Sequence, residues 1–365
     1  MFLNHGTFGA CPRPVFETYQ RWQLALERQP VEFLGRRHDA LLDEARARLG
    51  QYLNTHKDNL IFVPNATSGI NTVARSLKLQ PGDEILTTNH EYGAVDKTWE
   101  FITRHTGATI VRHQVSLPLT SAEEFISAFW HAVTPRTCEI SISHITSPTA
   151  LIFPVAEICR RAREADILTL IDGAHAPGHI PVDLTELGAD FYSGNCHKWL
   201  CAPKGAGFLY VHPQHQKLID PLVISHGWVD DSTFISRNEW QGTRDIAAFL
   251  SVPAAINFQE AHNWDTVRQQ CHTLASETRQ RIVNQYGLEP LSADSPEWFG
   301  QMAAAPIPGS DMNILKQRLY DEYRIEVPVF SWGKLSLVRF SFQGYNSHGD
   351  ADCLVDALAT LIPAG

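Results

Sequence analysis

D-F-Y-S-G-N-C-H-K-W-L-C-A-P-K-G-A-G-F-L, residues 190–209, is the stretch around which the chain is organised. Lys198 stands in it between His197 and Trp199, in an apolar, turn-rich setting rather than on a polar face. Such crowding lowers the pKa of an amine and makes it a nucleophile that can form a Schiff base. A lysine that reaches from a loop into solvent is the other interpretation, and this segment alone leaves both open.

A second segment, I-L-T-L-I-D-G-A-H-A-P at residues 167–177, favours the nucleophile. Its mostly aliphatic residues run into Asp172, which is typical of a buried parallel strand with a carboxylate at its C-terminal end, where open α/β sheets place their ligands. A carboxylate there can keep a pyridinium nitrogen protonated, and an aspartate with a lysine is the pair that pyridoxal phosphate (PLP) chemistry requires. A helix N-cap is the alternative role for Asp172.

Several further motifs, taken in order with these two, resemble the class V aminotransferase family of PLP enzymes over nearly the whole chain. Within the family they are most similar to isopenicillin N epimerase and its relatives. Each motif is weak alone, but their order and spacing are specific for the family. The motifs are L-N-H-G-T-F-G (3–9), N-A-T-S-G-I-N (65–71), H-E-Y-G-A (90–94), D-G-A-H-A-P-G (172–178), N-C-H-K-W-L-C-A-P-K-G-A-G-F-L (195–209), W-Q-G-T-R-D (240–245), V-R-F-S (338–341) and Y-N (345–346).

The resemblance implies a fold type I PLP enzyme: an α/β chain whose large domain has a mostly parallel, seven-stranded type of sheet between helices, followed by a small α+β C-terminal domain. We expect an N-terminal arm at 1–14, the PLP-binding domain at 15–250, and connector helices with the small domain at 251–365. Glycines and prolines argue against a helix in the arm. We expect helices at 14–29, 38–53, 69–77, 121–131, 154–165, 311–323 and 350–362, two helical patterns within 246–286, an ordered loop at 227–242, and strands at 60–63, 84–88, 109–115, 139–144, 167–171, 190–193, 206–211, 302–307, 325–329 and 335–340.

Composition excludes other classes of protein. The chain has 365 residues, 44% of them hydrophobic, and its net charge of −10 argues against non-specific nucleic-acid binding. Seven scattered cysteines without a C-x-x-C pattern support neither a disulfide framework nor a zinc site, so we expect no bound metal. No leader-like pattern and no run of about 18 apolar residues occurs, which predicts a cytoplasmic protein without a membrane span.

A strand, a small polar turn and a helix at residues 60–77 form an anion-binding arrangement, because a helix start offers unpaired N–H groups. A plain N-cap is the alternative for this turn. The resemblance implies that Ala66 and Thr67 belong to the phosphate-binding turn. It also implies that Asn195 and His197 contact the phosphate and that His175 hydrogen-bonds the 3-oxygen of PLP.

The remaining site residues come from strand ends and loops. We assign the stacking position on the cofactor ring to Tyr92 rather than to His90, with a core-covering aromatic as the alternative. Arg339 ends an apolar strand, where it is an edge residue or a carboxylate clamp; its context matches the substrate-carboxylate arginine of the family, and we place Asn4 of the arm beside the substrate. Gly242 and Thr243 match a loop that reaches the cofactor phosphate of a second subunit, which implies a homodimer with shared sites.

The resemblance implies an amino acid-type substrate whose α-carbon is deprotonated by Lys198 while Asp172 keeps the PLP ring nitrogen protonated. Epimerisation, C–S or related lysis and transamination all remain open. Desulfuration is disfavoured, because residues 327–334 contain no cysteine before the arginine. A non-catalytic binding protein with the same fold is the hypothesis of another class, and the presence of both Lys198 and Asp172 argues against it.

Overall fold

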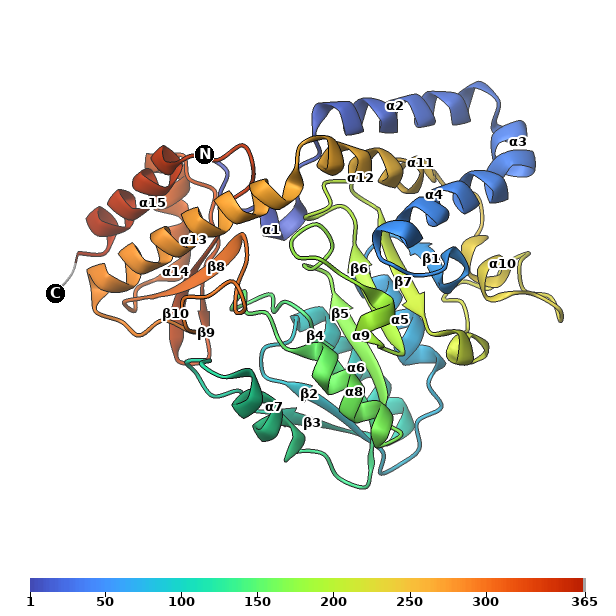
Figure 1. Cartoon of the computed structure of the whole chain (residues 1–365), viewed down its shortest axis with the longest axis horizontal. Coiled ribbons are helices and arrows are strands. Elements are labelled where there is room, and N and C mark those ends of the chain that lie inside the picture. Colours follow the sequence, from blue (N-terminus) through green and yellow to red (C-terminus); the bar gives the residue numbers. More distant parts are fainter. Residues whose placement is uncertain (364–365) are drawn as a thin grey trace.

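Seven strands form the larger of two sheets in the computed structural model, which describes residues 1–363 (Figure 1). Their spatial order is β1-β7-β6-β5-β4-β2-β3. The pairs β2–β3, β2–β4, β4–β5 and β5–β6 are parallel, whereas β7 runs antiparallel to both of its neighbours. The strands are β1 (Leu60–Val63), β2 (Glu84–Thr88), β3 (Thr109–His113), β4 (Thr137–Ser143), β5 (Leu168–Gly173), β6 (Phe191–Asn195) and β7 (Gly207–Val211).

Helices cover both faces of this sheet, which is why its central strands are buried in consecutive positions. Leu170 on one face packs with α5 and α6, and its neighbour Ile171 on the other face packs with α8; both are fully buried. The expected α/β fold with a mostly parallel seven-stranded sheet is therefore confirmed. Its helices include α2 (Arg13–Arg28), α4 (His38–Tyr52), α5 (Ala66–Ser76), α6 (Gly93–Thr106), α7 (Ala122–Trp130), α8 (Val155–Glu164) and α9 (Leu184–Leu187).

The C-terminal part builds a second, antiparallel sheet in the order β8-β10-β9. Helix α13 packs against β8 and α14 against β9, and α15 packs against both helices, beside the large sheet in Figure 1. The elements after the large sheet are α10 (Phe234–Glu239), α11 (Ala247–Leu250), α12 (Val252–Ala261), α13 (Trp264–Tyr286), β8 (Met302–Ile307), α14 (Met312–Tyr323), β9 (Val329–Trp332), β10 (Leu335–Ser341) and α15 (His348–Leu361).

The N-terminal arm pairs with this small sheet, although it is at the other end of the sequence. Its backbone makes parallel bridges from Phe2 to Glu326 and from Asn4 to Ser341. The arm then forms a single helical turn, α1 (His5–Phe8), so the prediction of an arm without a helix is wrong. The glycines do not prevent this turn because the Gly6 N–H is held by Ser341 Oγ at 3.1 Å and Gly9, at φ +73°, ends the turn.

Two other expected elements differ from the structure. The strand expected at 325–329 is only a bridge at Glu326, and β9 begins at Val329 instead, because Pro328 has no N–H to donate to a ladder. The loop expected at 227–242 contains α10, whose start is capped by Thr233 and Ser236; six residues are too few to show a helical period. Among residues 1–363, every helix falls short of the length or apolarity needed to cross a bilayer.

Candidate active site

A pocket of about 330 Å³ opens where the C-terminal ends of β4, β5 and β6 meet the N-terminus of α5. This is the edge at which parallel sheets place their ligands. The pocket brings together eight of the residues that the sequence predicts for the site, from four separate motifs. These eight are Ala66, Thr67, Tyr92, Asp172, His175, Asn195, His197 and Lys198.

Lys198 extends into the pocket from the turn that follows β6. Its Nζ lies 3.1 Å from Nε2 of His175. Burial lowers the pKa of the Lys198 amine to about 8; Asp172 raises it and Arg339 lowers it further. At neutral pH a much larger share of this amine is unprotonated than for an ordinary lysine, so it is available as a nucleophile or base.

Asp172 is the penultimate residue of β5 and pairs in register with Ser143 of β4. Its Oδ1 accepts the backbone N–H of Ala174 at 2.9 Å, and within residues 1–363 its Oδ2 accepts no hydrogen bond. Burial raises the pKa of Asp172, while the Ala174 N–H and the Lys198 charge lower it. A buried carboxylate of this kind is stabilised by a cation placed next to it in the pocket.

His175 connects Lys198 to the wall of the pocket. Its Nε2 faces Lys198, and its Nδ1 accepts a hydrogen bond from the indole Nε1–H of Trp199 at 3.2 Å. Burial lowers the pKa of His175 well below its usual value, and the charges of Lys198 and Arg339 act in the same direction. The ring is therefore neutral at physiological pH.

The phosphate-binding residues expected from the sequence meet at the start of α5. Thr67 lines the pocket in the first turn of the helix, but the N–H of Ala66 already donates to Oδ1 of Asn195 at 2.8 Å. Nδ1 of His197 donates to the carbonyl of Ala206 at 3.0 Å, and burial lowers the pKa of this ring to about 4. Thr67 is thus left for an anion, and Nε2 of His197 can donate to one only when the ring takes up a proton.

Tyr92 and His90 lie in different surroundings. The Tyr92 side chain is 47% exposed and lines the pocket at the N-cap of α6. His90 is fully buried, hydrogen-bonds Thr149 Oγ1 at 2.7 Å through Nδ1 and meets the Trp332 ring edge-on at 4.4 Å. His90 does not line the pocket, so of the two aromatic rings only Tyr92 can touch a ligand there.

Arg339 of β10 does not itself line the pocket, but it is bonded to two residues that do. Its Nη1 donates to Ser147, at 3.2 Å from Oγ, and its Nη2 donates to Thr7 Oγ1 at 3.1 Å. Both partners line the pocket, and burial lowers the pKa of Arg339 to about 10. Within residues 1–363 the guanidinium has no carboxylate partner, and its buried Nε has no hydrogen bond. A ligand carboxylate would supply what is missing.

Three predicted site residues lie elsewhere. Asn4 donates to Glu326 at 3.0 Å and accepts from Thr7, so it supports the residue that holds Arg339 and does not line the pocket. Gly242 and Thr243 do not line the pocket either. They follow α10, and Gly242 has a left-handed backbone at φ +98°.

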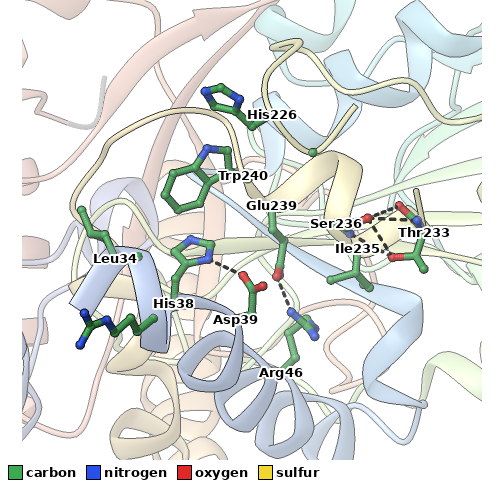
Figure 2. A pocket seen from close by; sticks show the side chains of 13 residues that line it. Leu34, His38, Asp39, Arg46, His226, Thr233, Ile235, Ser236, Glu239 and Trp240 are labelled. Atoms are coloured by element: carbon green, nitrogen blue, oxygen red, sulfur yellow. Dashed lines mark hydrogen bonds and ion pairs between the residues drawn. The ribbon is translucent and has the colours of Figure 1, made fainter. Parts of the chain in front are cut away.

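A second cavity, of about 500 Å³, lies between α4 and α10 (Figure 2). Helix α10 ends just before Gly242 in the sequence. Arg46 and Glu239 form a buried ion pair in the cavity, and His38 meets the Trp240 ring edge-on at 4.7 Å. Nε of Arg46 and Oε1 of Glu239 are buried without partners in the described chain. The cavity contains no residue that the sequence predicts for the site.

Sequence reasoning missed several residues around Lys198. Nε2–H of His5 donates to the Lys198 carbonyl at 3.1 Å, and Nδ1 of His5 is 2.9 Å from the Tyr345 hydroxyl. Glu91 is buried behind Asp172 and accepts from Thr88 and Ser143 at 2.6 Å each; burial raises its pKa to about 7. His5, Glu91 and Tyr345 stand in motifs that the sequence marks, but their roles depend on contacts between distant segments.

The fold and the pocket together define the class of protein. A mostly parallel seven-stranded sheet with a small C-terminal sheet, and a lysine and an aspartate at neighbouring strand ends, is the fold type I architecture of PLP enzymes. The aminotransferase class-V family matches residues 12–354. The chain therefore belongs to the class V aminotransferase family.

Relatives in this family differ in activity. The chain is 37% identical to isopenicillin N epimerase of Amycolatopsis lactamdurans, over 98% of this chain and 94% of that protein. It is 29% identical to a probable chloroplastic L-cysteine desulfhydrase of Arabidopsis thaliana, over 100% of this chain and 83% of that protein. A solved structure of C-DES, in a lysine variant with glycine covalently linked to its PLP cofactor, has the same fold, with a TM-score of 0.86 at 20% identity over 98% of this chain and 96% of that one.

Proposed function

We propose that this chain is a PLP-dependent enzyme that acts at the α-carbon of an amino acid or amino acid derivative, as an epimerase or a C–S lyase. The observation that carries the proposal is a pocket lined by the Lys198 amine of lowered pKa and the buried carboxylate of Asp172. Two of its lining residues, Thr7 and Ser147, hold the guanidinium of Arg339, which has no carboxylate partner within residues 1–363. These are the groups that the reaction of an amino acid with PLP needs.

The residues present fit PLP. A volume of about 330 Å³ lies within the range of about 300–1,000 Å³ that small-molecule sites occupy. Asp172 would hold the ring nitrogen, since a cation there offsets the burial that raises its pKa. Thr67, at the start of α5, and His197, in the turn after β6, would hold the phosphate. Lys198 would hold the cofactor covalently, and Tyr92 can cover its ring.

When bound, PLP supplies an electron sink that makes the α-proton of an amino acid acidic. The chain's own residues do the rest. Arg339 binds the substrate carboxylate with its unpaired edge, and Thr7 and Ser147 hold the guanidinium in that orientation. Lys198, once free, takes the α-proton, because its lowered pKa gives it a much larger unprotonated share near neutral pH than an ordinary lysine has. Asp172 keeps the proton on the ring nitrogen.

Two outcomes are favoured after the α-proton leaves. Its return to the opposite face of the α-carbon gives an epimerase, and loss of a sulfur leaving group from the β-carbon gives a lyase. The identity to isopenicillin N epimerase supports the first, and that to a cysteine desulfhydrase supports the second. Transamination is the alternative. Desulfuration has less support, because none of the cysteines of the described chain lines the pocket and Cys353 lies in α15.

A homodimer with shared sites belongs to the same proposal. Support comes from the segment before α10, which exposes a run of large apolar side chains on the single chain. Gly242 and Thr243, just after α10, would reach the phosphate in the pocket of the second copy. Light scattering during size-exclusion chromatography tests this, and a monomer at micromolar concentration would contradict it. The exposed residues are Leu222, Val223, Ile224, Trp228 and Val229.

The deciding experiment is a visible absorption spectrum of the purified protein with PLP, followed by a panel of amino acids that includes cysteine conjugates. A cofactor band that shifts with one class of substrate, with release of pyruvate and ammonia, identifies a lyase. A shift with loss of optical rotation and no release identifies an epimerase. Lys198→Ala should abolish the band of the covalently held cofactor. No band with PLP in excess would refute the proposal.

A further inference from the structure

The indole of Trp199 contacts His175 of the pocket but does not itself line the pocket. The side chain is fully buried, its ring stacks on His179 at 4.0 Å, and its Nε1–H points at Nδ1 of His175 at 3.2 Å. The motif H-K-W makes Trp199 the direct neighbour of Lys198 in the sequence. The proposed function uses Lys198 but gives no role to the tryptophan.

The chemistry of the indole decides the state of His175. An indole nitrogen is only a donor, so Nδ1 of His175 must present its lone pair to it. A neutral imidazole carries one proton, and with Nδ1 as acceptor that proton is on Nε2. Nε2 faces Nζ of Lys198 at 3.1 Å. The His175 N–H is therefore directed at the lysine, where it can be accepted by an unprotonated amine but not by an ammonium group.

We propose that Trp199 is a positioning residue that locks His175 in the tautomer with its proton on Nε2 and thereby disfavours the ammonium form of Lys198. The same lock keeps a hydrogen-bond donor, not an acceptor, directed into the pocket, where it suits an anionic oxygen such as the 3-oxygen of PLP. This second consequence rests on the proposed function. The first does not, because it concerns only residues of this chain.

Other charged and titratable groups surround the pair and act alongside the lock. Burial contributes most to the lowered pKa of Lys198, so Trp199 is one of several causes. The effect of Trp199 on Lys198 can be separated from these causes, because the indole acts only through its hydrogen bond to Nδ1 of His175. The groups from neighbouring elements are Asp172, Arg339, His179, His197 and, behind the lysine turn, His5.

The test is the pKa of Lys198 in the protein without cofactor. Competitive acetylation with trace anhydride at a series of pH values, with mass spectrometry of the peptide that contains Lys198, measures it directly. In Trp199→Phe the imidazole can move its proton to Nδ1 and accept from the lysine ammonium with Nε2. We expect the Lys198 pKa to rise by about one unit, the size expected for a hydrogen bond to a charged group.

Trp99→Phe is the matched control. Trp99 is 1% exposed and donates its Nε1–H to Ser141 Oγ at 2.8 Å, so the same atoms are removed from an equally buried site away from the lysine. In the Trp99→Phe variant the pKa of Lys198 should remain that of the wild type. A double variant with His175→Ala should abolish the effect of Trp199→Phe, because no ring remains for the indole to orient.

An unchanged or lowered Lys198 pKa in Trp199→Phe overturns the proposal, as does an equal rise in the His175→Ala background. If Trp199→Phe does not fold, nitrogen NMR of the wild type labelled in histidine decides the matter, with His175 assigned by its absence in His175→Ala. A proton on Nε2 supports the lock, and a proton on Nδ1 refutes it. Failure of the protein to bind PLP would refute the proposed function but leave this result unaffected.

Discussion

Nε2 of His5 lies 3.1 Å from the carbonyl oxygen of Lys198, across 193 residues of sequence. A carbonyl only accepts, so the His5 ring donates from Nε2, and its Nδ1 accepts from the hydroxyl of Tyr345 at 2.9 Å. The arm, the small domain and the turn that carries Lys198 thus share one hydrogen-bonded contact. Burial lowers the pKa of His5 to about 4, which keeps the ring neutral and this arrangement intact at neutral pH.

Replacing His5 with leucine should destabilise the protein by about 1–3 kcal/mol, because this fully buried ring bonds both the Lys198 carbonyl and the Tyr345 hydroxyl, and the carbonyl loses its donor. His5→Gln retains an N–H that can reach the carbonyl and should cost less. Urea unfolding of the two variants without cofactor measures the difference. Equal stability of the leucine and glutamine variants would show that packing, not the hydrogen bond, is what His5 provides.

Gly9 should tolerate no side chain. A Cβ there would lie 2.1 Å from the His197 carbonyl oxygen and 2.9 Å from Cα of Lys198, at a backbone φ of +73°. Gly9→Ala should cost about 1–3 kcal/mol or more and displace the lysine turn, which lowers PLP affinity. Gly82→Ala is the control, since its φ is +96° but a Cβ meets nothing within 4 Å. Thermal unfolding and a PLP titration compare them; equal losses in both variants would contradict the clash.

Arg339→Lys should lower kcat/KM by about 100-fold, mainly through KM, because lysine cannot offer the planar, bidentate edge that a carboxylate prefers. The cofactor band should remain, since Arg339 contacts Thr7 and Ser147 and no residue predicted to hold PLP. Arg318→Lys, on the exposed face of α14, is the control. Steady-state kinetics with the substrate found in the panel measure this, and a wild-type KM in Arg339→Lys would remove the arginine from the substrate site.

His197 should take up a proton when a phosphate group binds. Its Nδ1–H is used by Ala206, so Nε2 presents a lone pair unless the ring is protonated. The pKa of the ring, about 4 without ligand, must rise beside a dianion. A pKa that rises on binding means that affinity falls as pH increases.

Calorimetric titration of PLP in two buffers of different ionisation enthalpy counts the protons taken up. His197→Gln, which has an N–H at every pH, should take up fewer protons and show a flatter pH dependence than the wild type. The phosphate itself titrates near pH 6, so the comparison between the two proteins isolates the histidine. Identical proton uptake would exclude His197 from the phosphate site.

Glu139 in β4 should reduce stability at neutral pH. Both of its carboxylate oxygens are buried and have no hydrogen-bond partner in residues 1–363, and burial raises its pKa well above the usual value. When the pKa of a carboxyl group is higher in the folded state, the free energy of unfolding is unaffected at pH values below the unfolded pKa of about 4.3. It falls as the pH rises from there toward the folded pKa. Glu139→Leu should therefore raise Tm by about 2 °C or more at pH 8 and by less at pH 4.5. A gain that is independent of pH would contradict this.

Much of the fold was predictable because its signals are local. The bounds of β1, β2 and β8 agree with the predicted strands, since each is a short run rich in aliphatic or β-branched residues. The arm and β9 were not predicted correctly, because α1 depends on Ser341 and the start of β9 depends on Pro328 within a ladder. Ser341 is far in sequence from the arm. Pro328 directly precedes β9, but its effect depends on the pairing of β9 with β10, which no local period reveals.

The sequence by itself determined the kind of chemistry: a lysine in an apolar turn and an aspartate at a strand end are properties of short segments. Tertiary structure alone decided how these groups are tuned. Only the folded chain brings Trp199, His175 and Lys198 into one line and places His5 behind the lysine. It also leaves Arg339 buried without a carboxylate partner in the described residues. Burial and the direction of a donor arise from packing between distant segments, and these are what set a pKa and a tautomer.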